Sequence, residues 1–181
     1  PGLRSRGLAV RELAEARDPD AYVSALDAAR YASMNLVWND DRGRVAVAYT
    51  RREDRTLEIE RLSRGVHVLC NDRLGAEGFP RGERLRAGIE DALEQRIEWP
   101  ALAERLASLL GDHTRVDPPP SHLPTELARE LTATCIHSPF YGTRSATLIA
   151  AAPGRLIDYL HADGPPCTTP FIDRRPLLEG P

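Results

Sequence analysis

The chain has 181 residues, of which 41% are hydrophobic, so it can form one domain of ordinary size with a buried core. Its net charge of −3 and its scattered basic residues give no broad basic field, so we expect no nucleic-acid partner. No run of about 18 apolar residues and no apolar signal-peptide core occurs, which predicts a cytoplasmic protein without a membrane span. The three cysteines lie far apart in the sequence, which indicates free thiols in a reducing compartment.

The first part of the chain predicts two helices and then strands. Helical patterns run over residues 8–16 and 20–30, with Asp18 or Asp20 as the cap of the second helix. Four short alternating segments follow, at residues 35–38, 45–49, 56–62 and 65–70. Because these segments are sequential, we expect them to pair as antiparallel strands, with Val45, Val47 and Tyr49 on a buried face.

The second part of the chain changes to a helical period and then returns to strands. Helices are predicted at residues 82–95, 99–110 and 124–131, a further strand at 132–137, and a β-hairpin at 141–161. This order indicates an α+β fold with mostly antiparallel sheet. We predict a single domain over residues 1–163 and an irregular tail over residues 164–181.

Two polar side chains are candidates for chemistry. Arg144 stands at the mouth of the predicted hairpin, where a guanidinium suits a carboxylate, a phosphate or a developing oxyanion, although a solvated salt bridge is the alternative. Asn71 follows a predicted strand end, where its amide can donate into a cleft, although a plain turn with Asp72 is the alternative. Alternation points Cys70 into an apolar face, and a buried neutral thiol such as Cys70 or Cys135 is inert.

The sequence offers no motif for a metal or a phosphate. The five histidines fall at no metal-ligand spacing with one another or with the cysteines, so we predict neither a metal site nor a cofactor. The chain also has no glycine-rich phosphate loop and no GxSxG elbow. Several common enzyme classes are therefore excluded.

Four ordered motifs carry a resemblance to a known family. They are SRG at residues 5–7, YASMNL at 31–36, the stretch 65–81 with LCNDRL and FPR, and YGTRSAT at 141–147. Together they resemble the NRDE-motif family, also called the transport and Golgi organisation protein 2 family, over roughly residues 5–163. The resemblance implies an N-terminal nucleophile (Ntn) hydrolase-like fold, in which two stacked, mostly antiparallel sheets lie between helix layers (αββα).

The same resemblance implies site residues. In related choloylglycine-hydrolase-like enzymes, an N-terminal Cys attacks an amide while its own amino group serves as base. By this resemblance Asn71 takes the place of an oxyanion-hole Asn and Arg144 lies on a strand of the active-site cleft. Tyr141 and Thr143 are implied as substrate-binding residues of the cleft wall.

The sequence departs from the family pattern at its N-terminus. Residue 1 is Pro1, and neither the expected Cys-bearing strand nor an Asn-Arg-Asp-Glu tetrapeptide occurs. We therefore expect the fold to be N-terminally incomplete and this chain alone to be inactive. Exposed sheet edges then predict self-association or pairing with the missing N-terminal segment.

Two classes of function stay open. The first is an amide-bond (C–N) hydrolase whose nucleophile comes from the absent segment and which acts on a small-molecule substrate. The second is non-catalytic binding or trafficking of a small molecule, since eukaryotic relatives are linked to haem and lipid handling. For haem, the conceivable ligands are His67, His137, His161 and Cys135.

Overall fold

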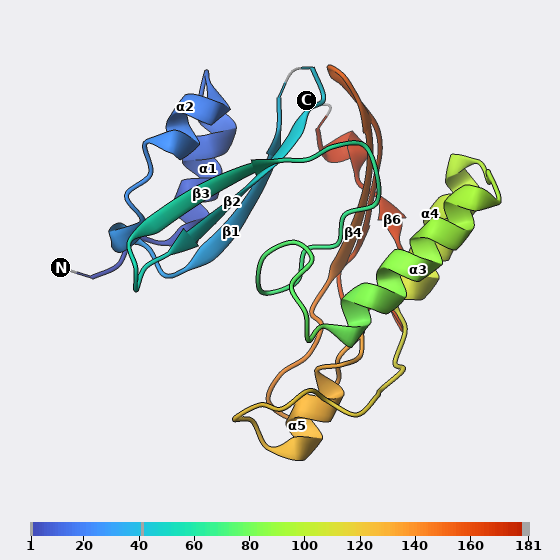
Figure 1. The fold of residues 1–181 in the computed structure, drawn as a ribbon. Coiled ribbons are helices and arrows are strands. Elements are labelled where there is room, and N and C mark those ends of the chain that lie inside the picture. Colours follow the sequence, from blue (N-terminus) through green and yellow to red (C-terminus); the bar gives the residue numbers. More distant parts are fainter. Residues whose placement is uncertain (1, 41, 179–181) are drawn as a thin grey trace. The chain divides into compact units, whose positions relative to one another are not determined.

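The computed structural model describes residues 2–40 and 42–178, which Figure 1 shows as a ribbon. These residues form helices and two small antiparallel sheets, so the predicted α+β class with mostly antiparallel sheet is confirmed. Pro1, Asp41 and residues 179–181, the last three of the predicted tail, lie outside the described residues.

The chain divides into two compact units. Unit 1 comprises the residues up to Gly65 together with Asn71–Arg73, and unit 2 comprises Val66–Cys70 together with the residues from Leu74 onwards. Each unit is described by itself. The single domain over residues 1–163 and the stacking of the two sheets stay predictions.

Unit 1 consists of two short helices, a 3₁₀ turn and a three-stranded sheet. Its elements in chain order are α1 (Arg6–Glu15), α2 (Pro19–Ser24), η1 (Ala28–Arg30), β1 (Met34–Asn39), β2 (Val45–Arg51) and β3 (Thr56–Arg61). The carboxylate of Asp18 accepts from the backbone N–H of Ala21 at 3.0 Å, so Asp18 and not Asp20 caps α2. The helix predicted over 20–30 is broken, because Asp27 caps the separate turn η1 through its side chain.

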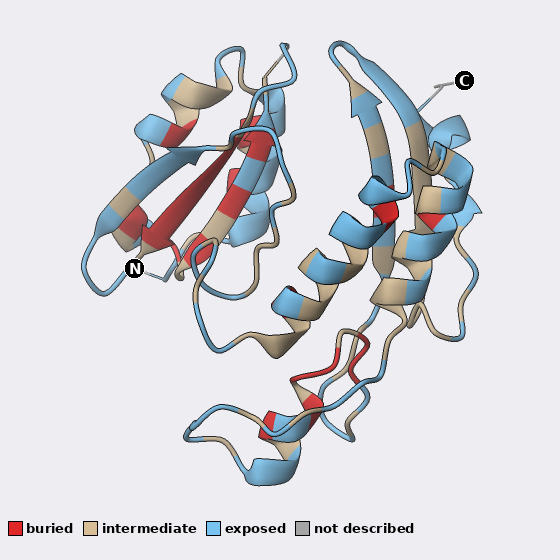
Figure 2. Ribbon diagram, turned by 45° about the vertical axis from the view of Figure 1, so that its right-hand side comes forward, coloured by how far each residue is buried: buried red, intermediate tan, exposed pale blue. Residues whose placement is uncertain are grey.

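The sheet of unit 1 packs its apolar face against the helices. Met34, Leu36 and Trp38 alternate along β1 and form one cluster with side chains of α1 and α2. Ala46 and Ala48 of β2 belong to the same cluster. The middle strand β2 is buried on both faces, where the sequence predicted one buried face, and Figure 2 shows it as buried along most of its length.

The strand predicted over residues 65–70 is wrong. The described residues of this segment form no strand, and Val66–Cys70 instead packs along helix α3 (Pro80–Glu94). Arg86 donates to the carbonyl of Val66 at 2.9 Å, and a Cβ placed on Gly82 would lie 3.1 Å from Cys70 Sγ. Alternating hydrophobicity here reflects burial against a helix and not pairing with β3.

Unit 2 combines the remaining helices with a β-hairpin. Its elements are α3, α4 (Trp99–Leu110), α5 (Thr125–Glu130), β4 (Ala146–Ala152), β5 (Arg155–Ala162), β6 (Ile172–Asp173) and η2 (Arg175–Leu177). Strands β4 and β5 form the predicted hairpin, and β6 pairs with β5, so the region predicted as an irregular tail contributes a short third strand. Trp99 donates to Asp158 at 2.9 Å, which links the start of α4 to β5.

The strand predicted over residues 132–137 is also wrong. The backbone N–H groups of Thr132 and Ala133 donate back to the carbonyls of Arg129 and Glu130 at 3.1 Å, so the chain turns at the end of α5. A single isolated bridge joins His137 to the YGTRSAT segment. The apolar residues of this stretch are buried in a turn, as Figure 2 shows beside α5, and not in a sheet.

Asp20 connects α2 to two strands of unit 1, and we expect it to make the stability of the fold depend on pH. Its carboxylate accepts from Arg61 at 2.7 Å and from Trp38 Nε1 at 2.9 Å, and these bonds lower the pKa of Asp20. A lowered pKa contributes stability that is complete above the unfolded value of about 4 and is lost as the pH falls through the folded value.

We predict that Asp20→Asn lowers the melting temperature at pH 7 and that the difference from the native protein shrinks below about pH 4. Thermal unfolding followed by circular dichroism between pH 2 and pH 7 measures this. Asp54→Asn, which changes an exposed carboxylate in the β2–β3 turn, is the control. A difference that stays constant over this pH range contradicts the prediction.

Candidate functional site

The loop that carries Asn71 is docked on the sheet face of unit 1 that points away from its helices. Tyr49 of β2 and Glu58 of β3 are register partners on this face. Arg73 forms an ion pair with Glu58, and its guanidinium lies 5.4 Å from the centroid of the Tyr49 ring. The hydrogen bond from Arg73 lowers the pKa of Glu58, so this carboxylate stays charged.

Asp72 gives the same loop a second anchor. Its backbone carbonyl accepts from the side-chain amide of Asn35 at 2.9 Å, and its carboxylate accepts from Arg51 at 3.3 Å. Asn71 itself is exposed. The residues that follow Asn71 therefore hold it at this sheet face, while its own side chain is accessible to solvent.

The YGTR turn in unit 2 is fixed by backbone and side-chain bonds to the segment before it. The N–H of Thr143 donates to the carbonyl of Ile136 at 2.9 Å, and the N–H of Ile136 donates to the Thr143 hydroxyl at 3.0 Å. The N–H of Ser138 donates to the carbonyl of Tyr141 at 2.9 Å, and the N–H of Tyr141 donates to the Ser138 hydroxyl at 3.0 Å. These bonds close a short loop with Phe140 at its tip.

The exposed side chains of this loop combine aromatic surface with a positive charge. Phe140 is 98% exposed and Tyr141 is 56% exposed. Arg144, two residues before β4, is exposed as well. The structure thus places the predicted residues Tyr141, Thr143 and Arg144 in one ordered turn of unit 2, whereas Asn71 belongs to unit 1. A cleft shared by Asn71 and Arg144 stays a prediction.

A cluster of two thiols and two imidazoles lies beside the YGTR turn. One nitrogen or sulfur atom from each of His113, Cys135, His137 and Cys167 lies within 4.8 Å of each of the others. Cys135 Sγ and Cys167 Sγ are 3.6 Å apart, and His137 Nε2 lies 3.6 Å from the first and 3.2 Å from the second. The ring centroids of His113 and His137 are 5.0 Å apart.

Separate segments of unit 2 deliver these four residues. His113 follows the end of α4, and the N–H of Cys135 donates to the carbonyl of Asp112 at 2.9 Å. Cys167 lies in the turn after β5, and a Cβ on Gly111 would lie 3.4 Å from Cys167 Cα. The small residue at the end of α4 therefore lets the backbone of Cys167 approach closely.

Burial determines the state of one thiol. Cys135 is fully buried, which raises the pKa of its thiol, so the thiol is neutral at pH 7. A buried neutral thiol is a poor nucleophile, as the sequence predicted for this residue. Residue spacing does not indicate that Cys167, 32 residues further along the chain, lies next to it.

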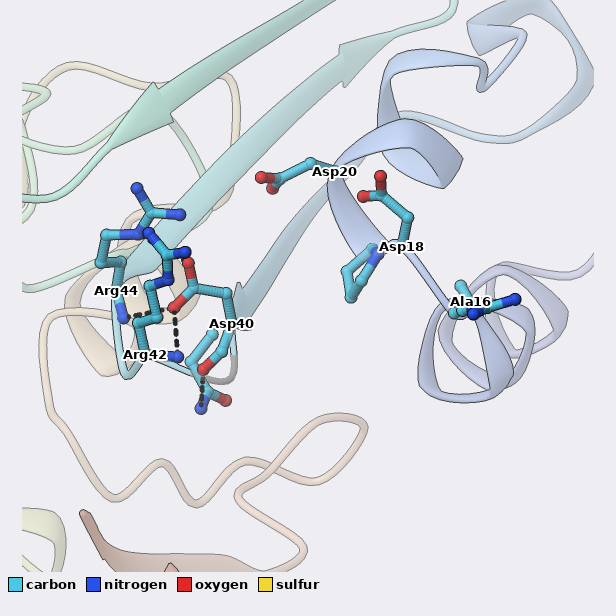
Figure 3. Close-up of a pocket in the computed structure, with 9 residues that line it drawn as sticks. Ala16, Asp18, Asp20, Asp40, Arg42 and Arg44 are labelled. Carbon is cyan, nitrogen blue, oxygen red and sulfur yellow. Dashed lines mark hydrogen bonds and ion pairs between the residues drawn. The ribbon is translucent and has the colours of Figure 1, made fainter. Parts of the chain in front are cut away.

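Unit 1 contains an open pocket of about 720 Å³ between the start of α2 and the β1–β2 turn, shown in Figure 3. Asp18, Asp20 and Asp40 line it, and each has a structural partner. Asp18 caps α2, Asp20 binds Arg61, and Asp40 accepts from Arg44 at 2.6 Å. The three carboxylates of the pocket therefore have structural contacts within unit 1.

Fold and site together define an α+β protein with an exposed arginine in a fixed turn and a Cys/His cluster beside that turn. The model of the family Transport and Golgi organisation 2 matches residues 1–160, and the chain belongs to this family. The match confirms the resemblance drawn from the sequence motifs. A search of curated proteins finds no match to the chain.

Among the described residues, no helix has the length and apolarity that a bilayer crossing requires.

The glycine of the YGTR turn is required by a close backbone approach. A Cβ on Gly142 would lie 3.0 Å from the carbonyl oxygen of Ile136, an atom of the backbone that cannot rotate away. We predict that Gly142→Ala destabilises the protein by about 1–3 kcal/mol, the usual cost of overpacking. Urea unfolding measures this, with Gly2→Ala as the control, since a Cβ on Gly2 meets no atom within 4 Å. Equal midpoints for the two variants would show that the turn adapts.

Proposed function

We propose that the protein binds a small amphipathic carboxylate through the YGTR turn, as a binding or trafficking protein. The observation that carries the proposal is the exposed Arg144. It directly follows Thr143, which two hydrogen bonds join to Ile136. A guanidinium binds a carboxylate through two parallel hydrogen bonds, and a backbone that is already fixed at Thr143 loses less conformational entropy on binding than a mobile loop.

The aromatic neighbours indicate which carboxylate is suitable. Phe140 and Tyr141 expose large apolar surfaces within four residues of Arg144, and such surfaces favour the hydrocarbon part of a ligand. Fatty acids and haem, with its propionates, share this combination of an apolar body and an anionic group. A cytoplasmic location is part of the proposal, because all three cysteines are free thiols.

We predict that Arg144→Ala weakens binding of a fatty acid such as laurate by roughly 10-fold to 100-fold, the effect of losing a charge-assisted hydrogen bond. Isothermal titration calorimetry measures it, and haem titration followed by absorbance is a separate arm that distinguishes the two ligand sources. Arg155→Ala is the matched control, because Arg155 is also exposed and lies at the other end of the same hairpin. Equal affinities of the native protein and Arg144→Ala would refute Arg144 as the anchor.

A second candidate function is hydrolysis of an amide bond, which uses Asn71. Its amide is exposed, and the anchored Asp72 and Arg73 hold its loop on the sheet face. Such a fixed donor suits the oxyanion of a tetrahedral intermediate. In this proposal the thiol of an N-terminal family Cys, outside these 181 residues, attacks the carbonyl. Its amino group takes the thiol proton and passes it to the leaving amine, and water then hydrolyses the thioester.

This second proposal predicts that N-acyl amides are cleaved only when the Cys-bearing N-terminal segment of the family is joined to the chain. Asn71→Ala in the joined protein is expected to lower kcat by about 10²–10³-fold, the loss seen when one oxyanion donor is removed. Asn39→Ala, which changes another exposed Asn of unit 1, is the control. Cleavage by the chain without that segment, or an unchanged kcat in Asn71→Ala, counts against it.

A further inference from the structure

We propose that His113, Cys135, His137 and Cys167 bind one Zn²⁺ ion in a tetrahedral Cys₂His₂ site in unit 2. Their four donor atoms lie within 4.8 Å of one another, which brings them around a single point. Thiolate and imidazole are the donors that zinc prefers, and two of each make a common structural zinc site. The proposal is independent of the proposed function, because none of the four residues belongs to the carboxylate or amide sites.

The distances fit a zinc ion. With Zn–S of about 2.3 Å and Zn–N of about 2.0–2.1 Å, a tetrahedral ion holds two sulfurs about 3.8 Å apart and a sulfur and a nitrogen about 3.6 Å apart. The two sulfurs are separated by 3.6 Å, and His137 Nε2 lies 3.6 Å and 3.2 Å from them. Shifts of a few tenths of an ångström bring these three donors into the geometry of a zinc site.

The fourth ligand is oriented by the protein. His113 Nδ1 lies 3.0 Å from the carbonyl oxygen of Cys135, and a carbonyl only accepts, so Nδ1 carries the proton. The lone pair of the neutral ring is then on Nε2. A ligand histidine whose other nitrogen donates to a backbone carbonyl is the usual arrangement in metal sites, because this bond fixes the tautomer and the ring orientation.

The ion would have a structural role. Four protein ligands leave no open position for substrate or water. They come from the end of α4, the turn after α5 and the turn after β5, so the ion would connect three segments that are distant in the sequence. Among the described residues of unit 2, the buried apolar side chains are mostly small ones, namely Ala92, Ala103, Ala128, Ala133, Cys135, Ile136, Leu148 and Ala162. A metal cross-link adds stability where such a core contributes little.

Zinc binding at this site balances in protons and charge, and the site is accessible from solvent. Each thiol releases one proton as its sulfur binds the ion, and two thiolates neutralise the charge of Zn²⁺. His113 and His137 are exposed, so the ion can enter from solvent and reach the buried sulfur of Cys135.

The test measures zinc directly. The reduced protein is incubated with Zn²⁺, freed of unbound metal by gel filtration and analysed by mass spectrometry for metal content. We expect one zinc per chain, thiolate-to-metal absorption when Co²⁺ replaces it, and a melting temperature that rises with zinc. His137→Ala and Cys167→Ser are expected to weaken zinc binding by on the order of 100-fold, as one of four ligands is lost.

Matched controls separate metal binding from folding. Cys70→Ser and His122→Ala change residues of the same types in unit 2 outside the cluster, and both should keep one zinc per chain. Circular dichroism confirms that the variants fold. His113→Ala removes another ligand at an exposed position, and it is preferred to Cys135→Ser because Cys135 is buried in the core. The proposal fails if the reduced native protein binds no zinc, if occupancy survives in both ligand variants, or if Cys135 and Cys167 form a disulfide that reductant does not open.

Discussion

The pair of bonds between Thr143 and Ile136 is the constraint on which unit 2 depends. Thr143 of the YGTRSAT motif uses its hydroxyl and its backbone N–H in these bonds, and so fixes the turn after α5. Each such bond contributes only about 1 kcal/mol, but together they determine the path of two segments at once. Cys135 precedes this contact on one segment and Arg144 follows it on the other, so the motif positions both the Cys/His cluster and the exposed arginine.

Much of the fold could be predicted because its signals are local. Alternation identified β1, β2, β3 and the β4–β5 hairpin, and the helical period identified α3 and α4. The false strand at residues 65–70 had the same alternation, but alternation reports only that one side of a segment is buried. Residues 65–70 are covered by α3, and residues 132–137 turn back onto the end of α5. The covering element is a tertiary fact that periodicity does not contain.

The candidate site was predictable only in part, for the same reason. The motif identified the YGTR turn and the loop of Asn71 because those residues are contiguous in the sequence. The Cys/His cluster has no such signature: His113 lies 22 residues before Cys135, and Cys167 lies 30 residues after His137. Cys135 and His137 lie two residues apart, but this spacing does not match the spacing of a known zinc motif. In zinc motifs that can be recognised by spacing, two ligands lie close together on one hairpin or helix. In this protein the four candidate ligands come from three separate segments.

The turn also connects the two proposals mechanically. Arg144 is covalently joined to Thr143, whose bonding partner Ile136 is flanked by two of the proposed zinc ligands, Cys135 and His137. An ion that immobilises those ligands therefore also restrains the base of the Arg144 side chain. A restrained guanidinium loses less entropy when it pairs with a carboxylate, so zinc should favour anion binding without contacting the anion. The two sites nevertheless use different side chains, and each of them can exist without the other.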